Sequence, residues 1–216
     1  LKEPIITGRS FQYNFTNEGG ADFTFRFLKN IMGLWLLQQC RNSWLSSGAE
    51  YSYPQLVEMA EREQAFRSFI DPGWSGFYNP ANMPDAINEY CTRTGQHIPG
   101  SPAEYSRIII ESLAMKYAEV LEQLEEVSGK KLNCIHIIGG GVNNELLCQF
   151  TANATGLKVI AGPSEGTAAG NILMQMKAMG IVQSVQEIRE IVADSFELKE
   201  YHPENQERWR SAYKDY

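Results

Sequence analysis

The chain has 216 residues, of which 43% are hydrophobic and 21% charged, and its formal net charge is -7 at pH 7. This length and composition are sufficient for a buried hydrophobic core, and we expect one large globular domain. An acidic chain is poorly suited to nucleic acid or to an anionic membrane surface, so we expect neither as a partner. No stretch reaches the roughly 20 apolar residues that a membrane span requires.

The four cysteines, Cys40, Cys91, Cys134 and Cys148, are widely spread. They form no Cys-x-x-Cys or cysteine–histidine spacing of the kind that indicates a zinc site. This usage predicts reduced thiols in a cytoplasmic protein and no metal site. The chain begins at Leu1 without an initiator methionine, and its first residues read as the interior of a longer sequence. We therefore expect a fragment.

The N-terminal region predicts strands followed by a helix. Residues 4–15 alternate apolar and polar positions with a period of two, and residues 16–20 are expected to close this region as a turn. From 23 to about 41 the apolar positions recur at helical spacing, with Asn30 and Gln38 as polar interruptions. From spacing alone, solvated or capped amides explain both residues better than ligand contacts do.

Capping signals predict the helices of the middle of the chain. Two helix starts are marked by a serine cap with a nearby proline, at Ser52-Tyr53-Pro54 and Ser101-Pro102. Gly95 and Gly129 mark two helix ends. A segment rich in aromatic residues, glycine and proline over 66–84 predicts an ordered surface excursion, within an irregular helical region at about 45–100. The helices expected here run over about 52–63, 84–94 and 101–129.

The segment on which the rest of the chain depends is 135–138, Ile-His-Ile-Ile, followed by three glycines and two asparagines. The β-branched residues predict a strand that is buried on both faces. Three consecutive glycines, Gly139–Gly141, remove every Cβ from the turn, so that backbone can approach a ligand closely. Asn143 or Asn144 would then cap a helix over 145–155, whose N-terminus favours a phosphate-bearing occupant of the turn.

This glycine turn differs from the standard phosphate loops. A Walker loop needs Lys-Ser/Thr after its last glycine, and a Rossmann fingerprint needs a third glycine where Asn144 stands. On spacing alone, a tight structural turn and a ligand site are equally good interpretations. The elements expected after it are a strand over 157–161 and helices over 165–179, 184–194 and from 203 onward.

Several segments together carry a family resemblance. They are, in chain order, Thr-Asn-Glu-Gly-Gly at 16–20, Leu-Lys-Asn-Ile-Met-Gly-Leu-Trp-Leu-Leu-Gln at 28–38, Ile-Gly-Gly-Gly at 138–141, Ala-Gly-Pro at 161–163 with Glu165, and Gly-Asn at 170–171. The chain resembles, over nearly its whole length, the C-terminal half of sugar kinases of the FGGY family. The segment 28–38 is the most specific part of the resemblance.

The resemblance implies an α/β fold of the ribonuclease H-like type, as in actin and hexokinase, with ATP and sugar bound between two domains. Residues 1–216 would form the C-terminal, nucleotide-binding domain, with its first strands missing. The implied partner is the N-terminal kinase domain of the same polypeptide. Oligomeric state is not predicted.

The resemblance also implies the roles of individual residues. Asn30 would contact the sugar and Gln38 would contact ATP, both from one helix at the cleft. Gly140 would lie against the nucleotide, within the turn Gly139–Gly141, and Asn144 stands where relatives place a residue beside the adenine.

The implied reaction is phosphoryl transfer from Mg-ATP to the 1-hydroxyl of a ketose, L-rhamnulose, so ATP and Mg²⁺ are the expected cofactors. In the family, the general-base aspartate and a phosphate-contacting threonine lie upstream of the position of Leu1. We therefore expect no catalytic residue in this chain, and no activity from the chain alone. Some relatives have a cysteine pair in the region of Cys91, but the second position is Ile108 here, so no disulfide is expected there.

Three other functions remain open. A kinase of a related ketose, L-fuculose or D-xylulose, is one, because most sugar contacts would belong to the other half. A non-catalytic sugar or nucleotide sensor is the second, since a fold does not guarantee an activity. A plain oligomerisation domain is the third, but it gives no reason for three glycines after a strand.

Overall fold

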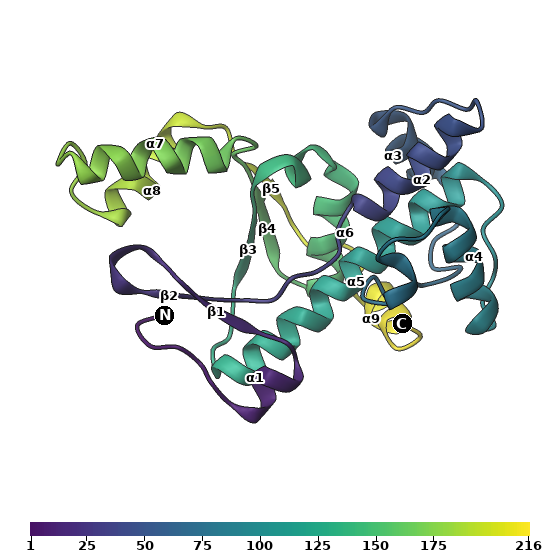
Figure 1. The fold of residues 1–216 in the computed structure, drawn as a ribbon, viewed down its shortest axis with the longest axis horizontal. Coiled ribbons are helices and arrows are strands. Elements are labelled where there is room, and N and C mark those ends of the chain that lie inside the picture. The colour runs from purple at the N-terminus through teal and green to yellow at the C-terminus, as the bar shows by residue number, and fades with distance from the viewer. The chain divides into compact units, whose positions relative to one another are not determined.

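The computed structural model describes residues 1–216, which form two compact units. The first unit comprises residues 1–132 together with Tyr216, and the second comprises residues 133–215. Figure 1 shows the helices and strands of each. None of the helices combines the length and the apolar character that crossing a membrane demands.

The first unit consists of a β-hairpin and a group of helices that pack on the longest helix, α5. In chain order its elements are α1 (Gly8–Gln12), β1 (Thr16–Gly19), η1 (Ala21–Phe23), β2 (Phe25–Leu28), α2 (Trp35–Ser46), α3 (Tyr53–Arg62), η2 (Ser75–Phe77), α4 (Met83–Arg93) and α5 (Pro102–Ser128). Both α2 and α3 pack against α5. The aromatic excursion contributes Phe69, Ile70 and Phe77 to the buried core, as an ordered segment should.

The strand prediction over 4–15 is wrong. A helix, α1, begins there because the side chains of Thr7 and Ser10 each accept a hydrogen bond from the other's backbone N–H. The segment 16–20, expected to be a closing turn, is mostly strand β1, which pairs antiparallel with β2. The hairpin of β1 and β2 therefore lies later in the sequence than the apolar alternation over 4–15 predicts.

The helix predicted over 23–41 is wrong in its first half. Residues 25–28 form β2, residues 29–33 have no regular structure, and α2 begins only at Trp35. Pairing with β1 overrides the local helical spacing, and Gly33 is unfavourable inside a helix. Asn30 therefore does not share a helix with Gln38.

The other helices predicted in this unit are confirmed. The side chain of Ser52 accepts the N–H of Gln55 at the start of α3, and that of Ser101 accepts the N–H of Glu104 at the start of α5. Gly129 adopts the left-handed conformation that ends α5. Cys91 is a free, buried thiol on α4.

The first half of α5 is buried on all sides and contains an ion pair. Arg107 Nε lies 2.6 Å from Glu111 Oε1, one helical turn further on. Arg107 also donates to the carbonyl of Ala60 at 3.1 Å, and the N–H of Phe66 donates to Glu111 at 2.9 Å. The pair therefore connects the end of α3 and the start of the aromatic segment 66–84 to α5.

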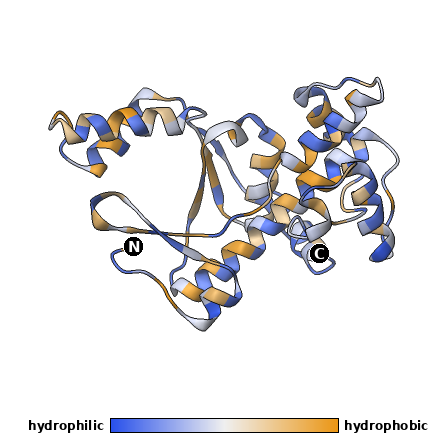
Figure 2. Cartoon of the chain, viewed as in Figure 1, coloured by the Kyte–Doolittle hydropathy of each residue, from blue (hydrophilic) through white to orange (hydrophobic).

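The second unit is built on a three-stranded sheet. In chain order its elements are β3 (Cys134–Ile137), η3 (Gly139–Asn143), α6 (Glu145–Thr155), β4 (Lys158–Ala161), α7 (Gly166–Ala178), α8 (Val185–Ser195), β5 (Lys199–Tyr201) and α9 (Gln206–Tyr213). The strand order is β3-β4-β5, with β3 and β4 parallel and β5 antiparallel to β4. Strands β3 and β4 are largely hydrophobic, as Figure 2 shows. The mixed α/β class expected from the sequence is confirmed.

The core of this unit lies between the sheet and α6. Val159 and Ala161 of β4 are buried together with Cys148 and Ala152 of α6 and with Tyr201 of β5. The prediction that β3 is buried on both faces is wrong, because β3 is an edge strand of this sheet. Its residue His136 is exposed, and β4 is the central strand. Strand β5 was not predicted, because a run as short and charged as Lys-Glu-Tyr gives little strand signal.

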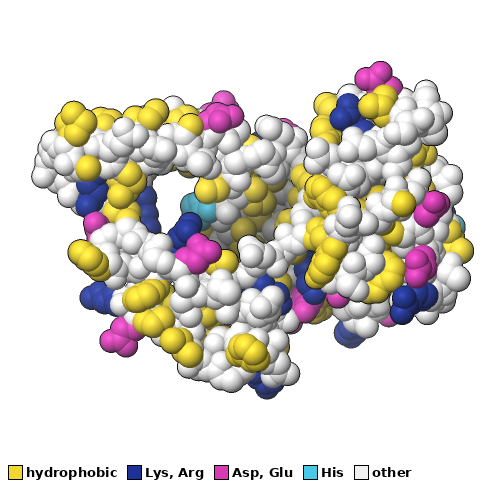
Figure 3. All heavy atoms as spheres, in the orientation of Figure 1, with side chains coloured by type: hydrophobic (Ala, Val, Ile, Leu, Met, Phe, Trp, Pro, Cys, Tyr) yellow, Lys and Arg dark blue, Asp and Glu magenta, His cyan; other side chains and the backbone are white.

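Helices α7 and α8 pack on each other around a small cluster of Leu173, Val182 and Ile188. The predicted starts and ends of both helices are confirmed to within a residue or two. Four large apolar side chains remain exposed here: Ile172 and Met174 on α7, and Met179 and Ile181 in the connection to α8. Figure 3 shows hydrophobic side chains on the surface of this part of the molecule.

Candidate functional site

The glycine turn follows β3 and is joined to the turn that follows β4. The N–H of Gly139 donates to the carbonyl of Pro163 at 3.1 Å, and the N–H of Gly162 donates to the carbonyl of Ile137 at 2.9 Å. These bonds hold both turns together at the carboxyl ends of the two parallel strands. In α/β proteins, this edge of the sheet is where ligands bind.

The three glycines have different surroundings. Gly139 has a φ of 76°, a conformation that residues with a side chain rarely adopt. A Cβ on Gly141 would lie 3.5 Å from Ile137 Cγ2, in ordinary contact with the strand below. A Cβ on Gly140 would meet nothing within 4 Å. The turn therefore offers bare backbone to open space at Gly140.

Asn144 caps the helix that follows the turn. Its Oδ1 accepts the N–H of Leu147 at 2.9 Å, and its side chain is buried. The sequence left the choice between Asn143 and Asn144 open, and the structure assigns the cap to Asn144. Because the cap uses Oδ1, Nδ2 is the atom left for a hydrogen bond to a ligand. The cap residue of α6 stands three residues after the last glycine, Gly141.

A lysine that sequence reasoning missed lies at the same edge. Lys199 pairs with Ala161 at the end of β4, and its Nζ lies 2.6 Å from Glu145 Oε2 in the first turn of α6. The hydrogen bond that the Lys199 ammonium donates to the Glu145 carboxylate raises the pKa of Lys199. No sequence pattern indicated the position of Lys199, because its strand, β5, was not predicted.

The remaining predicted site residues, Asn30 and Gln38, lie in the first unit. Asn30 is exposed in the irregular segment between β2 and α2. Gln38 is exposed on α2, on the face opposite the buried Leu37 and Cys40. Both amides are accessible to a ligand. The structure groups Gly139–Gly141 with Asn144 in one unit and places Asn30 and Gln38 in the other.

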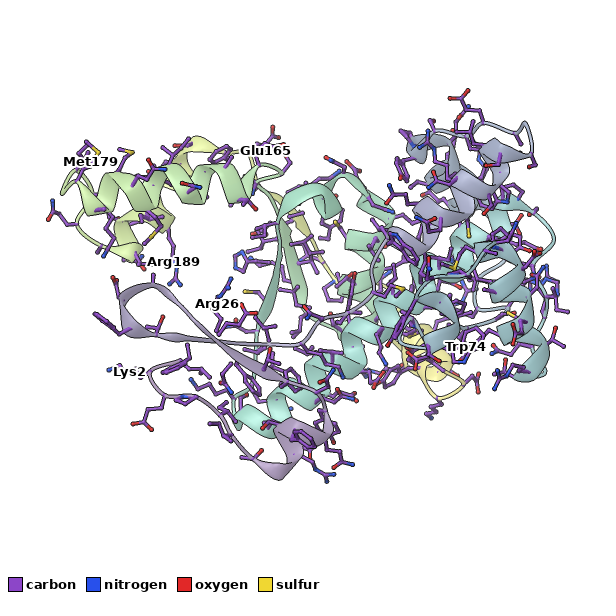
Figure 4. All side chains as sticks on the ribbon, in the orientation of Figure 1. Lys2, Arg26, Trp74, Glu165, Met179 and Arg189 are labelled. Carbon is purple, nitrogen blue, oxygen red and sulfur yellow. The ribbon has the colours of Figure 1, made fainter.

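The described residues contain no group of three or more His, Cys, Asp or Glu side chains arranged to hold a metal ion. Acidic side chains occur at the edge of the site, among them Glu145 and Glu165, which is labelled at the start of α7 in Figure 4. They do not form a cluster of that kind.

The chain matches a family model and several curated proteins. The model of the FGGY family of carbohydrate kinases, C-terminal domain, matches residues 1–179. A rhamnulokinase from Bacteroides thetaiotaomicron is 46% identical over 210 residues, which cover 97% of this chain and 42% of the relative. A rhamnulokinase from Bacillus subtilis is 42% identical over 207 residues, which cover 96% and 42%. The chain thus spans about 42% of the length of these relatives.

Solved structures of sugar kinases share the fold. A ligand-bound xylulose kinase from Lactobacillus acidophilus has a TM-score of 0.69 at 15% identity, covering all of this chain and 43% of that one. A gluconate kinase from the same organism gives a TM-score of 0.69 at 16% identity with the same coverage. These likenesses confirm the fold expected from the resemblance. The family match over most of the chain leads to a plain conclusion: the chain belongs to the FGGY family of carbohydrate kinases.

Proposed function

We propose that this chain is the ATP-binding half of a kinase that transfers the γ-phosphoryl group of ATP to the 1-hydroxyl of L-rhamnulose. The observation that carries the choice of sugar is the name rhamnulokinase on relatives that are 46% and 42% identical across nearly the whole chain. Residues 1–216 act as the C-terminal, nucleotide-binding domain, with an irregular helical excursion at about 45–100. An N-terminal kinase domain of the same cytoplasmic polypeptide completes the cleft.

The glycine turn is our proposed contact for the nucleotide. Gly139–Gly141 present backbone rather than side chains, and the space over Gly140 is open, which supports close approach of ATP. The N-terminus of α6 favours an anion nearby, and Asn144 retains an amide donor. Gln38 is the proposed ATP contact from the first unit.

Asn30 is our proposed contact for the sugar. Its amide is exposed and offers both a donor and an acceptor, which suits a sugar hydroxyl that donates and accepts. Substitution by alanine would remove that hydrogen bond and leave the hydroxyl with water as a partner.

Phosphoryl transfer requires this chain to position the substrates rather than to supply a reactive group. Phosphoryl transfer depends on in-line placement of nucleophile and phosphate and on stabilisation of charge on the phosphate oxygens. Mg²⁺ would enter with ATP and would neutralise part of that charge. The general base would belong to the N-terminal domain, so the isolated chain is expected to bind nucleotide without turnover.

The test is ADP release by the full-length polypeptide with Mg-ATP and a panel of L-rhamnulose, L-fuculose, D-xylulose and glycerol. We expect a strong preference for L-rhamnulose. In Asn30→Ala the KM for that sugar should rise about tenfold, the effect of one lost hydrogen bond, with the KM for ATP unchanged. The matched control is Asn42→Ala, an exposed asparagine on α2. A preference for another ketose would show that L-rhamnulose is not the substrate. Nucleotide binding without turnover of any sugar would favour a non-catalytic sensor.

A further inference from the structure

Lys29 stands between the last residue of β2 and the proposed sugar contact, Asn30. Its Nζ donates to Gln123 Oε1 on α5 at 2.8 Å. The same ammonium lies 5.8 Å from the ring centroid of Phe15, which is stacked on Phe27 of the hairpin with centroids 4.7 Å apart. Lys29 therefore contacts both α5 and the hairpin at the point where the chain leaves β2.

The partner of Lys29 belongs to a continuous set of polar contacts along α5. Gln123 Nε2 donates to Glu119 Oε1 at 2.7 Å, and Lys116 Nζ donates to Glu119 Oε2 at 2.8 Å. Lys116 also lies 3.1 Å from Asp71 Oδ1 in the aromatic excursion. Gln123 is thus held on its far side, and its Oε1 is fixed in the direction of Lys29.

An ammonium at this position is unfavourable by itself. Burial lowers the pKa of Lys29, and the nearby charge of Lys116 lowers it further. An apolar side chain of the same length would fill the space without that desolvation cost. What only the ammonium provides is a directed bond to α5, which fixes how the next residue leaves the hairpin.

We propose that Lys29 is a positioning residue that anchors the segment 29–33 to α5 and thereby sets the place of the Asn30 amide toward the sugar. The proposal rests on the proposed function of Asn30. Lys29 acts through Asn30 and does not touch the sugar, because its ammonium is directed to Gln123 and Phe15. An anchor of this kind matters because the Asn30 amide can bond a sugar hydroxyl only at a distance of about 3 Å, so a displaced amide loses the contact.

The test compares Lys29→Met, Lys29→Arg, Gln123→Leu and the Lys29→Met/Gln123→Leu double variant in the full-length polypeptide. Lys29→Met and Gln123→Leu should each raise the KM for L-rhamnulose about tenfold, with kcat and the KM for ATP within about twofold. The double variant should equal either single variant, because both remove one contact. Lys29→Arg keeps a donor and should recover most of the loss. Lys131→Met, which removes an exposed lysine paired with Glu125, is the control and should change nothing.

The NMR order parameters of the backbone amides of residues 29–33 are the second readout, and they do not depend on turnover. The order parameters should be lower in Lys29→Met and Gln123→Leu than in the wild type and the Lys131→Met control. An unchanged KM for the sugar, an equal rise in both Michaelis constants, or unchanged order parameters would overturn the proposal. Absence of turnover in the wild type would refute the proposed function, and the order parameters alone would then decide whether Lys29 anchors the segment.

Discussion

The backbone N–H of Gly139 donates a hydrogen bond to the carbonyl oxygen of Pro163 across 3.1 Å. This bond joins the turn after β3 to the turn after β4, and Gly139 makes it with a φ of 76°. Its neighbour Gly140 has no positive φ but faces open space. Adjacent glycines therefore serve two different purposes: Gly139 is needed for backbone geometry, and Gly140 leaves room above the turn.

The conformational requirement at Gly139 predicts a loss of stability in Gly139→Ala. The left-handed conformation costs a residue with a side chain about 1–2 kcal/mol, so the free energy of unfolding should fall by that amount. Gly170→Ala is the matched variant in the same unit, since Gly170 lies within α7 with nothing within 4 Å of its added Cβ. It should raise stability by up to about 1 kcal/mol. Urea unfolding measures both, and equal stability of the two variants would contradict the structure.

The buried pair of Arg107 and Glu111 predicts a strong single-variant effect and partial compensation. Arg107→Met removes the cation that is paired with the buried carboxylate of Glu111, which should cost about 3–5 kcal/mol. The Arg107→Met/Glu111→Leu double variant should be more stable than Arg107→Met. Recovery should be incomplete, because the N–H of Phe66 loses its acceptor. With Glu111→Leu as the second single variant, additive changes in the free energy of unfolding, measured by urea denaturation, would show that the two charges are not coupled.

Glu104 predicts a dependence of stability on acid pH. The N–H of Gly100 donates to its carboxylate at 2.7 Å, and this bond, with help from His97 and Arg67, lowers the pKa of Glu104. A carboxyl whose pKa is lower in the folded state stabilises the fold above its unfolded pKa of about 4.3. That contribution is lost as pH falls through the folded pKa.

Glu104→Gln is the variant that tests this dependence. Wild type should be more stable than Glu104→Gln near pH 7, and the difference in unfolding free energy should shrink as pH falls below about 4.3. Glu50→Gln, at an exposed position, is the control and should follow the wild-type curve. A difference that stays constant between pH 7 and pH 3 would contradict the assigned cause.

The sequence predicted best those elements whose determinants are local. The caps at Ser52, Ser101 and Asn144 are confirmed because each bonds a backbone N–H three residues away. Strand β2 was predicted as helix because its determinant is a partner strand, not its own apolar spacing. Likewise, the edge position of β3 depends on which other strands join the sheet, and the periodicity of one segment does not indicate this.

The candidate site was predictable only in part. The glycine turn and its cap follow from residue types in a short segment, and the structure places them together. The roles proposed for Asn30 and Gln38 come from the family resemblance, since spacing alone gave solvated amides as the better explanation. The contacts of Lys29 with Gln123 and of Lys199 with Glu145 join residues far apart in the sequence, so no local pattern announces them.

The most direct measurement is the KM for ATP of Gly140→Leu in the full-length polypeptide. The backbone at Gly140 tolerates a side chain, and the new side chain would occupy the open space over the turn. We expect the KM for ATP to rise about tenfold or more through blocked approach, with the KM for the sugar little changed. Gly8→Leu, another glycine with open space around it, should leave both constants unchanged. An unchanged KM for ATP in Gly140→Leu would remove the glycine turn from the nucleotide site.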